Sequence, residues 1–235
     1  MVVDVKDYPL LLNTNGVKGT LDGTKTQTRR LDRLGIINAN PDDWWLDEEY
    51  QKLNIAFGGA HAHFVRSNAK KGEPSSLRIN CPYGEAGARL WVRETWMLFG
   101  YSVCNSAFIH YKASFNENGG ERLLQLPEDR PTVLMQHKVR KWQPSIHMPK
   151  WASRIPLEIV GVRVERLLDI TEEDARAEGV KAKYVGGFIT LEHQKYYKYK
   201  DGFIDYWDNI YAQRGYGRES NPFVWVILYR MISGG

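Results

Sequence analysis

The stretch PLEIVGVRVERL, residues 156–167, is the clearest long strand in this sequence and decides its fold class. Apolar and polar residues alternate along it, as they do in a strand with one buried face, and Gly161 predicts a bulge within it. Residues 89–96 alternate in the same way, and the apolar run at residues 223–229 is typical of a buried strand. Together the three segments predict a mainly β fold.

Short helices are predicted at residues 14–22, at residues 203–213, and after the capping sequence TEED at residues 171–174, where Gly179 closes the helix. Residues 38–80 are rich in Asn, Asp, Gly, Ser and Lys, so we expect a loop-rich insertion with little regular structure there. The whole pattern predicts an α+β fold, a small β-barrel decorated by short helices.

The chain has 235 residues, which is enough to bury a sizeable core, and we expect one domain spanning residues 1–235. Two cysteines, Cys81 and Cys104, are too few for a disulfide scaffold and favour a reducing, cytoplasmic setting. The first residues lack the pattern of a signal peptide, and no stretch approaches the roughly 18 apolar residues of a membrane span. The net charge of +4 favours an anionic partner.

The run GTKTQTRR, residues 23–30, has no large apolar side chain and is rich in hydrogen-bond donors, a composition typical of segments that line polar sites. Within it, the Lys25 amine can serve as a base if burial or a neighbouring cation lowers its pKa. The Thr28 hydroxyl becomes a nucleophile only when such a base lies beside it. The residue types alone leave two other interpretations open, a basic loop that binds phosphates and a plain solvated turn.

Five motifs follow one another along the chain: KTQTRR at 25–30, LWVRETW at 90–96, PSIHMP at 144–149, WASR at 151–154 and NPFVWV at 221–226. The same motifs occur in the same order in the phage and prophage proteins of the ASCH family, which this chain therefore resembles. The resemblance covers most of the sequence, with the exception of residues 38–80 and parts of 114–135 and 183–200.

The resemblance implies a PUA-like β-barrel with flanking helices, and the binding of RNA or another nucleic acid. Small bacterial ASCH proteins hydrolyse the acetyl amide of N4-acetylcytidine, and ribonuclease activity is attributed to other members. These amidohydrolases carry the motif GRKTxT, whose Lys and second Thr are catalytic, and a catalytic Glu in a short helix after the long strand. By this resemblance, the catalytic residues here are Lys25, Thr28 and Glu178.

Two positions depart from the family pattern. Thr24 stands where the family usually has Arg, which removes a cation that would help to lower the pKa of Lys25. Ala88 stands where a turn is normally followed by Asp, which removes a turn-stabilising hydrogen bond. Glu178, in contrast, has support of its own, because an anion in the last turn of a helix is disfavoured by the helix dipole and so breaks a local rule.

Arg93 and Glu94 lie inside an apolar strand, so one of them must point inward or be paired. One interpretation is a structural salt bridge. The other is that Arg93, with Trp91 or Trp96, stacks on a base or contacts a phosphate.

Ser145 and His147 are further candidates to line a nucleic-acid-binding pocket. His61 and His63 form an HxH pair, but the sequence supplies no two further ligands at a suitable spacing, so no metal site is expected.

Two function classes remain open from the sequence. The first is an enzyme that hydrolyses an N-acyl amide on cytidine, with Lys25, Thr28 and Glu178 meeting in one pocket. The second is a binding module, in which the same pocket and a basic rim formed by Lys25, Arg29 and Arg30 hold nucleic acid without turnover. No cofactor is expected. The expected partner is RNA, single-stranded nucleic acid or a modified nucleoside, in the cytoplasm of a host if a phage encodes the protein.

Overall fold

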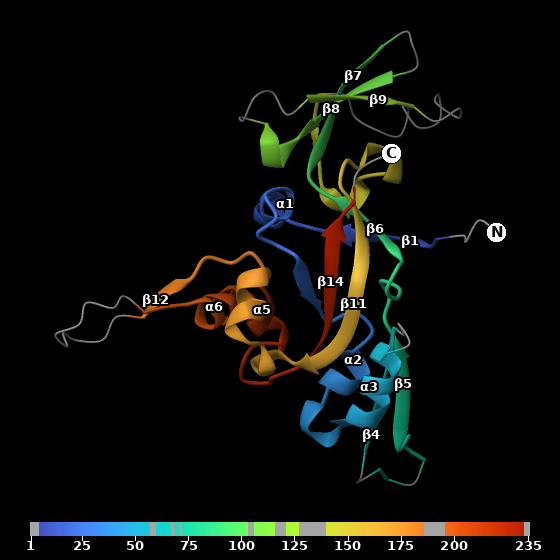
Figure 1. Ribbon diagram of the computed structural model, residues 1–235, viewed down its shortest axis with the longest axis vertical. Helices are drawn as coiled ribbons and strands as arrows, with labels where there is room; N and C mark the ends of the chain where they lie inside the picture. Colours follow the sequence, from blue (N-terminus) through green and yellow to red (C-terminus); the bar gives the residue numbers. More distant parts are fainter. Residues whose placement is uncertain are drawn as a thin grey trace, which may run out of the picture. The chain divides into compact units, whose positions relative to one another are not determined.

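The computed structural model describes residues 5–56, 60–66, 69–70, 72–102, 106–115, 121–126, 140–185 and 196–232. Most of the regular structure in these residues is strand, arranged in several sheets, with few helices (Figure 1). This confirms a mixed, mainly β fold. The described strands form open sheets, and the closed barrel stays a prediction.

The chain separates into two compact units. The first contains Met1–Gly23, Arg89–Glu158 and Met231–Gly235, and the second contains Thr24–Ala88 and Ile159–Arg230. Each unit therefore combines segments that are far apart in the sequence.

In the first unit, β1 (Asp7–Leu11) pairs in parallel with β6 (Arg89–Arg93), and β6 pairs antiparallel with the beginning of β11 (Pro156–Arg166). The helix α1 (Thr14–Leu21) follows β1 and agrees with the expected helix at 14–22. Its first turn is capped by Asn13, whose side-chain oxygen accepts a hydrogen bond from the Gly16 N–H at 2.8 Å.

A second sheet of the first unit has the strand order β10-β7-β8-β9. Its strands are β10 (Trp142–Gln143), β7 (Trp96–Ser102), β8 (Ser106–Tyr111) and β9 (Glu121–Gln125). One face of this sheet packs into a hydrophobic core. The short turns η3 (Ser145–His147) and η4 (Lys150–Ala152) follow β10 in the sequence, and this core includes Met148, directly after η3, and Ala152, at the end of η4. A further short turn, η2 (Lys112–Ser114), follows β8.

In the second unit, β2 (Gln27–Arg30) pairs antiparallel with β14 (Phe223–Met231), and β14 runs beside β11, red beside gold in Figure 1. The helices α5 (Glu172–Ala177) and α6 (Tyr199–Tyr211) cover one face of β14. Their apolar residues form a core with Val224 and Val226, which explains why residues 223–229 are apolar and lack charge.

The expectation of a loop-rich insertion at residues 38–80 needs correction, because this segment contains regular structure. It holds η1 (Pro41–Asp43), α3 (Glu48–Ala56) and a three-stranded sheet of β3 (Trp45–Leu46), β4 (His61–Val65) and β5 (Ser76–Asn80), preceded by α2 (Gly35–Asn38). In β4, buried Ala62 and Phe64 alternate with His61 and His63. That pattern of a half-buried strand was hidden by the polar composition around it.

The remaining elements of the second unit are η5 (Leu167–Asp169), η6 (Ala212–Arg214) and a short pair, β12 (Lys183–Val185) with β13 (Tyr196–Lys198). Cys81 is a buried free thiol, whose pKa is raised to about 12 by burial, and Cys104 lies outside the described residues. Among the helices described, none has both the length and the apolar character needed to cross a membrane.

Candidate functional site

The backbone of the second unit brings Lys25 and Glu178 together, although they are 153 positions apart in the sequence. The two residues form an isolated antiparallel β-bridge, and the Thr26 N–H donates to the Ala177 carbonyl at 2.9 Å. Glu178 caps the C-terminal end of α5, so the helix ends where it meets the segment that leads into β2. This bridge places the Lys25 side chain beside the last turn of α5.

Gly179 makes this approach possible. Its φ is +73°, in the left-handed region that favours glycine and is unusual for other residues. A Cβ atom at this position would lie 2.8 Å from the Lys25 Cβ, closer than real Cβ atoms come to one another. The sequence signal for a helix stop at Gly179 is therefore also a requirement for close contact with Lys25.

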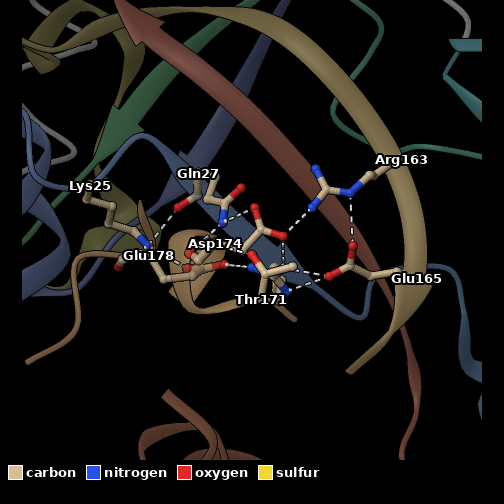
Figure 2. Close-up of polar contacts among 8 residues, drawn as sticks. Lys25, Gln27, Arg163, Glu165, Thr171, Asp174 and Glu178 are labelled. Atoms are coloured by element: carbon tan, nitrogen blue, oxygen red, sulfur yellow. Dashed lines mark hydrogen bonds and ion pairs between the residues drawn. The ribbon is translucent and has the colours of Figure 1, made fainter. Parts of the chain in front are cut away.

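The Lys25 amine has three acceptors within hydrogen-bond distance. Its Nζ donates to the Gln27 carbonyl at 2.9 Å, to the Glu178 carbonyl at 2.8 Å and to Glu178 Oε2 at 2.8 Å (Figure 2). An ammonium group has three protons, so the charged form of Lys25 is fully used by these partners. Lys25 is only 8% exposed, which makes this a buried ion pair.

Burial is the main influence on the pKa of Lys25. Removal from water disfavours the charged form and lowers its pKa below the usual value of 10.5. The Glu178 carboxylate acts in the opposite direction and raises the pKa, but the effect of burial is larger, and Arg30 and Arg29 add to the lowering. Lys25 is therefore easier to deprotonate than an ordinary lysine, which is what a role as a base requires.

Arg29 connects Glu178 to two further carboxylates. Its Nη1 donates to Glu178 Oε1 at 3.0 Å, and its Nη2 contacts Glu165 Oε1 at 2.5 Å and Asp174 Oδ2 at 3.2 Å. Arg163 binds the other oxygen of Glu165, with its Nε on Oε2 at 2.9 Å, and shares Asp174 Oδ2 with Arg29, its Nη2 lying 2.6 Å from that oxygen (Figure 2). Three cations thus face three carboxylates in one network across β2, β11 and α5.

Gln27 ties the middle of this network to the helix. Its amide Nε2 donates to the Asp174 carbonyl at 2.5 Å and to Asp174 Oδ1 at 3.1 Å. Asp174 in turn is held by the helix cap, because its N–H donates to the Thr171 hydroxyl at 3.1 Å. The capping sequence found at residues 171–174 therefore also positions a carboxylate of the network.

The environment of Arg29 differs from the one expected for a basic rim. Its side chain has 0% exposure, and its donors are directed at Glu165, Asp174 and Glu178. Lys25 is buried as well, so neither side chain is placed to contact phosphate in this arrangement. Arg30, the third predicted rim residue, is partly buried.

Thr28 is buried but lies on the other side of β2. Successive side chains of a strand point to opposite faces, and Gln27 and Arg29 both face α5. Thr28 is paired with Ile227 and faces away from that side. Of the three residues expected to meet, Lys25 and Glu178 are in contact, and the hydrogen bonds of Lys25 go to Gln27 and Glu178 rather than to Thr28.

The other predicted binding residues belong to the first unit. The Arg93 guanidinium lies 5.4 Å from the centre of the Trp91 ring, and its Nη2 donates to the Ile146 carbonyl in η3. The flanking residues Ser145 and His147 are half-buried and exposed, respectively. Arg93, Trp91 and the η3 turn are therefore neighbours within the first unit.

Glu94 forms the structural salt bridge that was one of the two interpretations of this strand. The Arg154 guanidinium binds it in a bidentate manner, with Nε on Oε1 at 2.8 Å and Nη2 on Oε2 at 3.1 Å. Burial raises the pKa of Glu94, while Arg154 counteracts this shift. The pair explains how a carboxylate is accommodated between the buried strands.

His61 and His63 contact the ring of Tyr50, and His63 Nδ1 lies 3.2 Å from Asp47 Oδ2. Within the described part of the chain, no three His, Cys, Asp or Glu side chains are grouped so that they would hold a metal ion.

Sequence reasoning missed Glu165, Arg163 and Asp174 as members of the central network. A signal for two of them was present, because Arg163 and Glu165 are two residues apart in the long strand and so share a face. What the sequence did not reveal was that this face meets Arg29. No family model, curated protein or solved structure matches this chain.

Proposed function

We propose that this protein hydrolyses an N-acyl amide on a cytidine-type nucleobase, at the Lys25–Glu178 pair. The observation that supports the proposal most is the 2.8 Å contact between Lys25 Nζ and Glu178 Oε2, two residues that are 153 positions apart. Their partnership was implied by the resemblance to ASCH amidohydrolases. Chance packing seldom joins a buried lysine and a buried carboxylate that a reaction would need together.

The proposed reaction adds water to the acyl carbon and breaks the bond between that carbon and the exocyclic nitrogen of the base. The products are a carboxylic acid and the free amine of cytidine, so one proton must be removed from the attacking group and one delivered to the leaving nitrogen. Lys25 is suited to move such a proton because burial lowers its pKa. Glu178 would orient Lys25 and accept a hydrogen bond from the amine.

The attacking group is either a water molecule or the Thr28 hydroxyl. Because Thr28 lies on the opposite face of β2, we favour water as the attacking group. In either case a substrate oxygen must replace one of the three acceptors of Lys25, and the charged amine then stabilises the developing oxyanion.

A second candidate function is the binding of RNA or a modified nucleoside without turnover. The specific observation in its favour is that protein atoms already occupy all three donor positions of Lys25, while Arg29 and Lys25 each bind one oxygen of Glu178. A network so fully paired is also what a structural scaffold requires. The PUA-like barrel, a phage origin and a cytoplasmic location remain part of the proposal through the ASCH resemblance.

The test is to incubate the protein with N4-acetylcytidine, with other N4-acylated cytidines and with acylated RNA, and to identify the products by mass spectrometry. We expect deacylated cytidine from the wild type, and a loss of at least about 100-fold in rate for Lys25→Met and Glu178→Gln, the scale of general acid–base catalysis. Lys52→Met serves as the matched control, since Lys52 is an exposed lysine of the same unit.

Three results would decide against hydrolysis. Product formation that survives both Lys25→Met and Glu178→Gln would place the chemistry elsewhere. Tight binding of the nucleosides without any product would favour the second candidate. Cleaved RNA chains, detected in the same spectra, would indicate a ribonuclease instead.

A further inference from the structure

The sheet β10-β7-β8-β9 of the first unit has one buried face and one face that remains partly open. Trp96, Leu98 and Ile109 point into the core on the buried side. On the other side, Met97 is paired with His110 in β8 and with Trp142 in β10, so these side chains share a face. A register shift between Leu98 and Gly100 interrupts the alternation of β7 next to Phe99.

Four aromatic rings follow one another across this open face. The centres of the Phe99 and His110 rings are 4.8 Å apart, those of His110 and Phe115 are 5.5 Å apart, and those of Phe115 and Trp142 are 5.2 Å apart. Each pair is packed edge to face, at interplanar angles between 65° and 84°. We call these four residues the ring row.

A cation lies at each end of the ring row. The Arg140 guanidinium is 5.1 Å from the centre of the Phe99 ring, and the Lys112 ammonium is 5.0 Å from the centre of the Trp142 ring. Both cationic residues are exposed. The two phenylalanines are 40% and 41% exposed, although aromatic side chains of this size are normally buried when a core is available.

His110 indicates that the ring row is not simply an extension of the core. Both of its ring nitrogens are shielded from solvent and have no hydrogen-bond partner among the described residues. Buried polar atoms of folded proteins are almost always paired, so such a ring calls for an explanation. Its contacts on both sides are with Phe99 and Phe115, and it holds these two exposed rings in place.

We propose that the ring row, with Arg140 and Lys112, binds single-stranded nucleic acid by stacking unpaired bases on Phe99 and Phe115. Every base has a π-face that can stack on an exposed ring, and cations at the ends of a row of rings attract the phosphates between the bases. A duplex conceals its base faces and so fits this surface less well. The carboxylates of an acidic peptide would pair with the two cations, but such a peptide has no flat groups to stack on the exposed rings.

This inference goes beyond the proposed hydrolysis and does not rest on it. All six residues belong to the first compact unit, whereas Lys25, Glu178 and their network belong to the second. Loss of amide hydrolysis would leave the binding surface intact, and loss of the binding surface would leave hydrolysis of a free nucleoside intact. Measurement of both properties on the same variants therefore distinguishes the two proposals.

The experiment measures binding of a fluorescein-labelled 12-nucleotide oligouridylate to the full chain by fluorescence anisotropy. Phe99→Leu and Phe115→Leu keep an apolar side chain but remove the flat ring. We expect each to weaken binding about tenfold, within the range for a stacked base. Phe115→Trp keeps a ring for stacking and should retain wild-type affinity, which separates stacking from a general disturbance of the sheet.

The cations are tested through the salt dependence of the same binding. Arg140→Gln and Lys112→Gln should each reduce the slope of log K against log salt by about 0.7, the value for one contact with a single strand. Lys52→Gln, which removes an exposed cation from the second unit, is the matched control and should not change the slope.

The proposal is overturned if the wild type does not bind the oligonucleotide, if both Leu variants bind as tightly as the wild type, or if a duplex of the same length binds equally well. In the last case the surface would act through charge alone. Binding of a polyglutamate peptide that is lost in the Leu variants, without binding of the oligonucleotide, would identify an acidic protein as the occupant instead.

Discussion

At the scale of single residues, the number of hydrogen-bond donors on the Lys25 amine indicates its protonation state in the candidate site. A neutral amine has two N–H groups and a lone pair, yet all three neighbours of Nζ are oxygen acceptors. Arg29 donates to the other carboxylate oxygen of Glu178, so both oxygens of that side chain are paired. Three acceptors match the three protons of an ammonium, whereas burial lowers the pKa of Lys25 and makes it easier to deprotonate than an ordinary lysine.

Gly179 offers the sharpest test of the contact with α5. Gly179→Ala introduces both an unfavourable left-handed backbone and a Cβ that would lie 2.8 Å from the Lys25 Cβ. Gly215→Ala is the matched control, since its φ is +81° but no atom lies within 4 Å of the added Cβ. We expect Gly215→Ala to lower the free energy of unfolding by about 1 kcal/mol and Gly179→Ala by clearly more. Equal losses in urea denaturation would contradict the close approach.

At the scale of secondary-structure elements, the charged network joins β2, β11 and α5 through Arg29. The guanidinium is the only group that contacts all three carboxylates among the described residues, and it is fully buried. Removal of one partner from a buried network leaves the other charges without compensation, which costs more than the network contributes as a whole.

Arg29→Met should therefore lower the free energy of unfolding by about 3 kcal/mol or more, the range for a broken buried pair. Arg218→Met is the control, because Arg218 also contacts two carboxylates, on Asp205 and Asp208, but is half exposed. Such surface pairs contribute about 0–1 kcal/mol. Urea denaturation of both variants compares the two cases directly, and similar losses would show that the network at Arg29 is not a buried one.

The elements that the sequence predicted well are those with a clear local pattern. β11 was predicted from its alternation, β14 from its apolar run and α5 from its cap. The sheet within residues 38–80 was missed because its short strands are embedded in polar sequence.

The candidate site was predicted only in part, for a physical reason. Lys25 and Glu178 were paired through a family resemblance, since nothing in local sequence specifies a contact over 153 positions. The burial of Arg29 was not predicted either. A run of basic residues is expected to be exposed to solvent unless the carboxylates that pair with it are known. The alternation of side chains along a strand, in contrast, can be applied to the sequence alone, and it places Thr28 on the opposite face from Gln27 and Arg29.

At the scale of the whole molecule, the two compact units carry different chemistry. The buried charged network lies in the second unit, and the ring row lies in the first. Substitutions in one unit should therefore leave the measured property of the other unchanged, since sites that share no partners contribute independently.

The pH dependence of stability gives the last prediction. The pKa of Lys25 is lowered in the folded state, so between that pKa and the usual 10.5 the unfolded chain binds more protons than the folded one. The contribution of Lys25 to the free energy of unfolding must then rise with pH through this window, by at most about 1.4 kcal/mol per pH unit, and this contribution is constant below the window. Lys25→Met lacks this group.

The measurement compares urea denaturation of the wild type and Lys25→Met from pH 7 to pH 10.5, because other lysines and tyrosines contribute to both proteins and cancel in the difference. We expect the wild type to gain stability relative to the variant as the pH rises. A difference that stays constant would mean that Lys25 titrates alike in both states, and a difference that falls would mean that Glu178 outweighs burial. Either result would remove the physical basis for Lys25 as a base and favour the charged, purely electrostatic role.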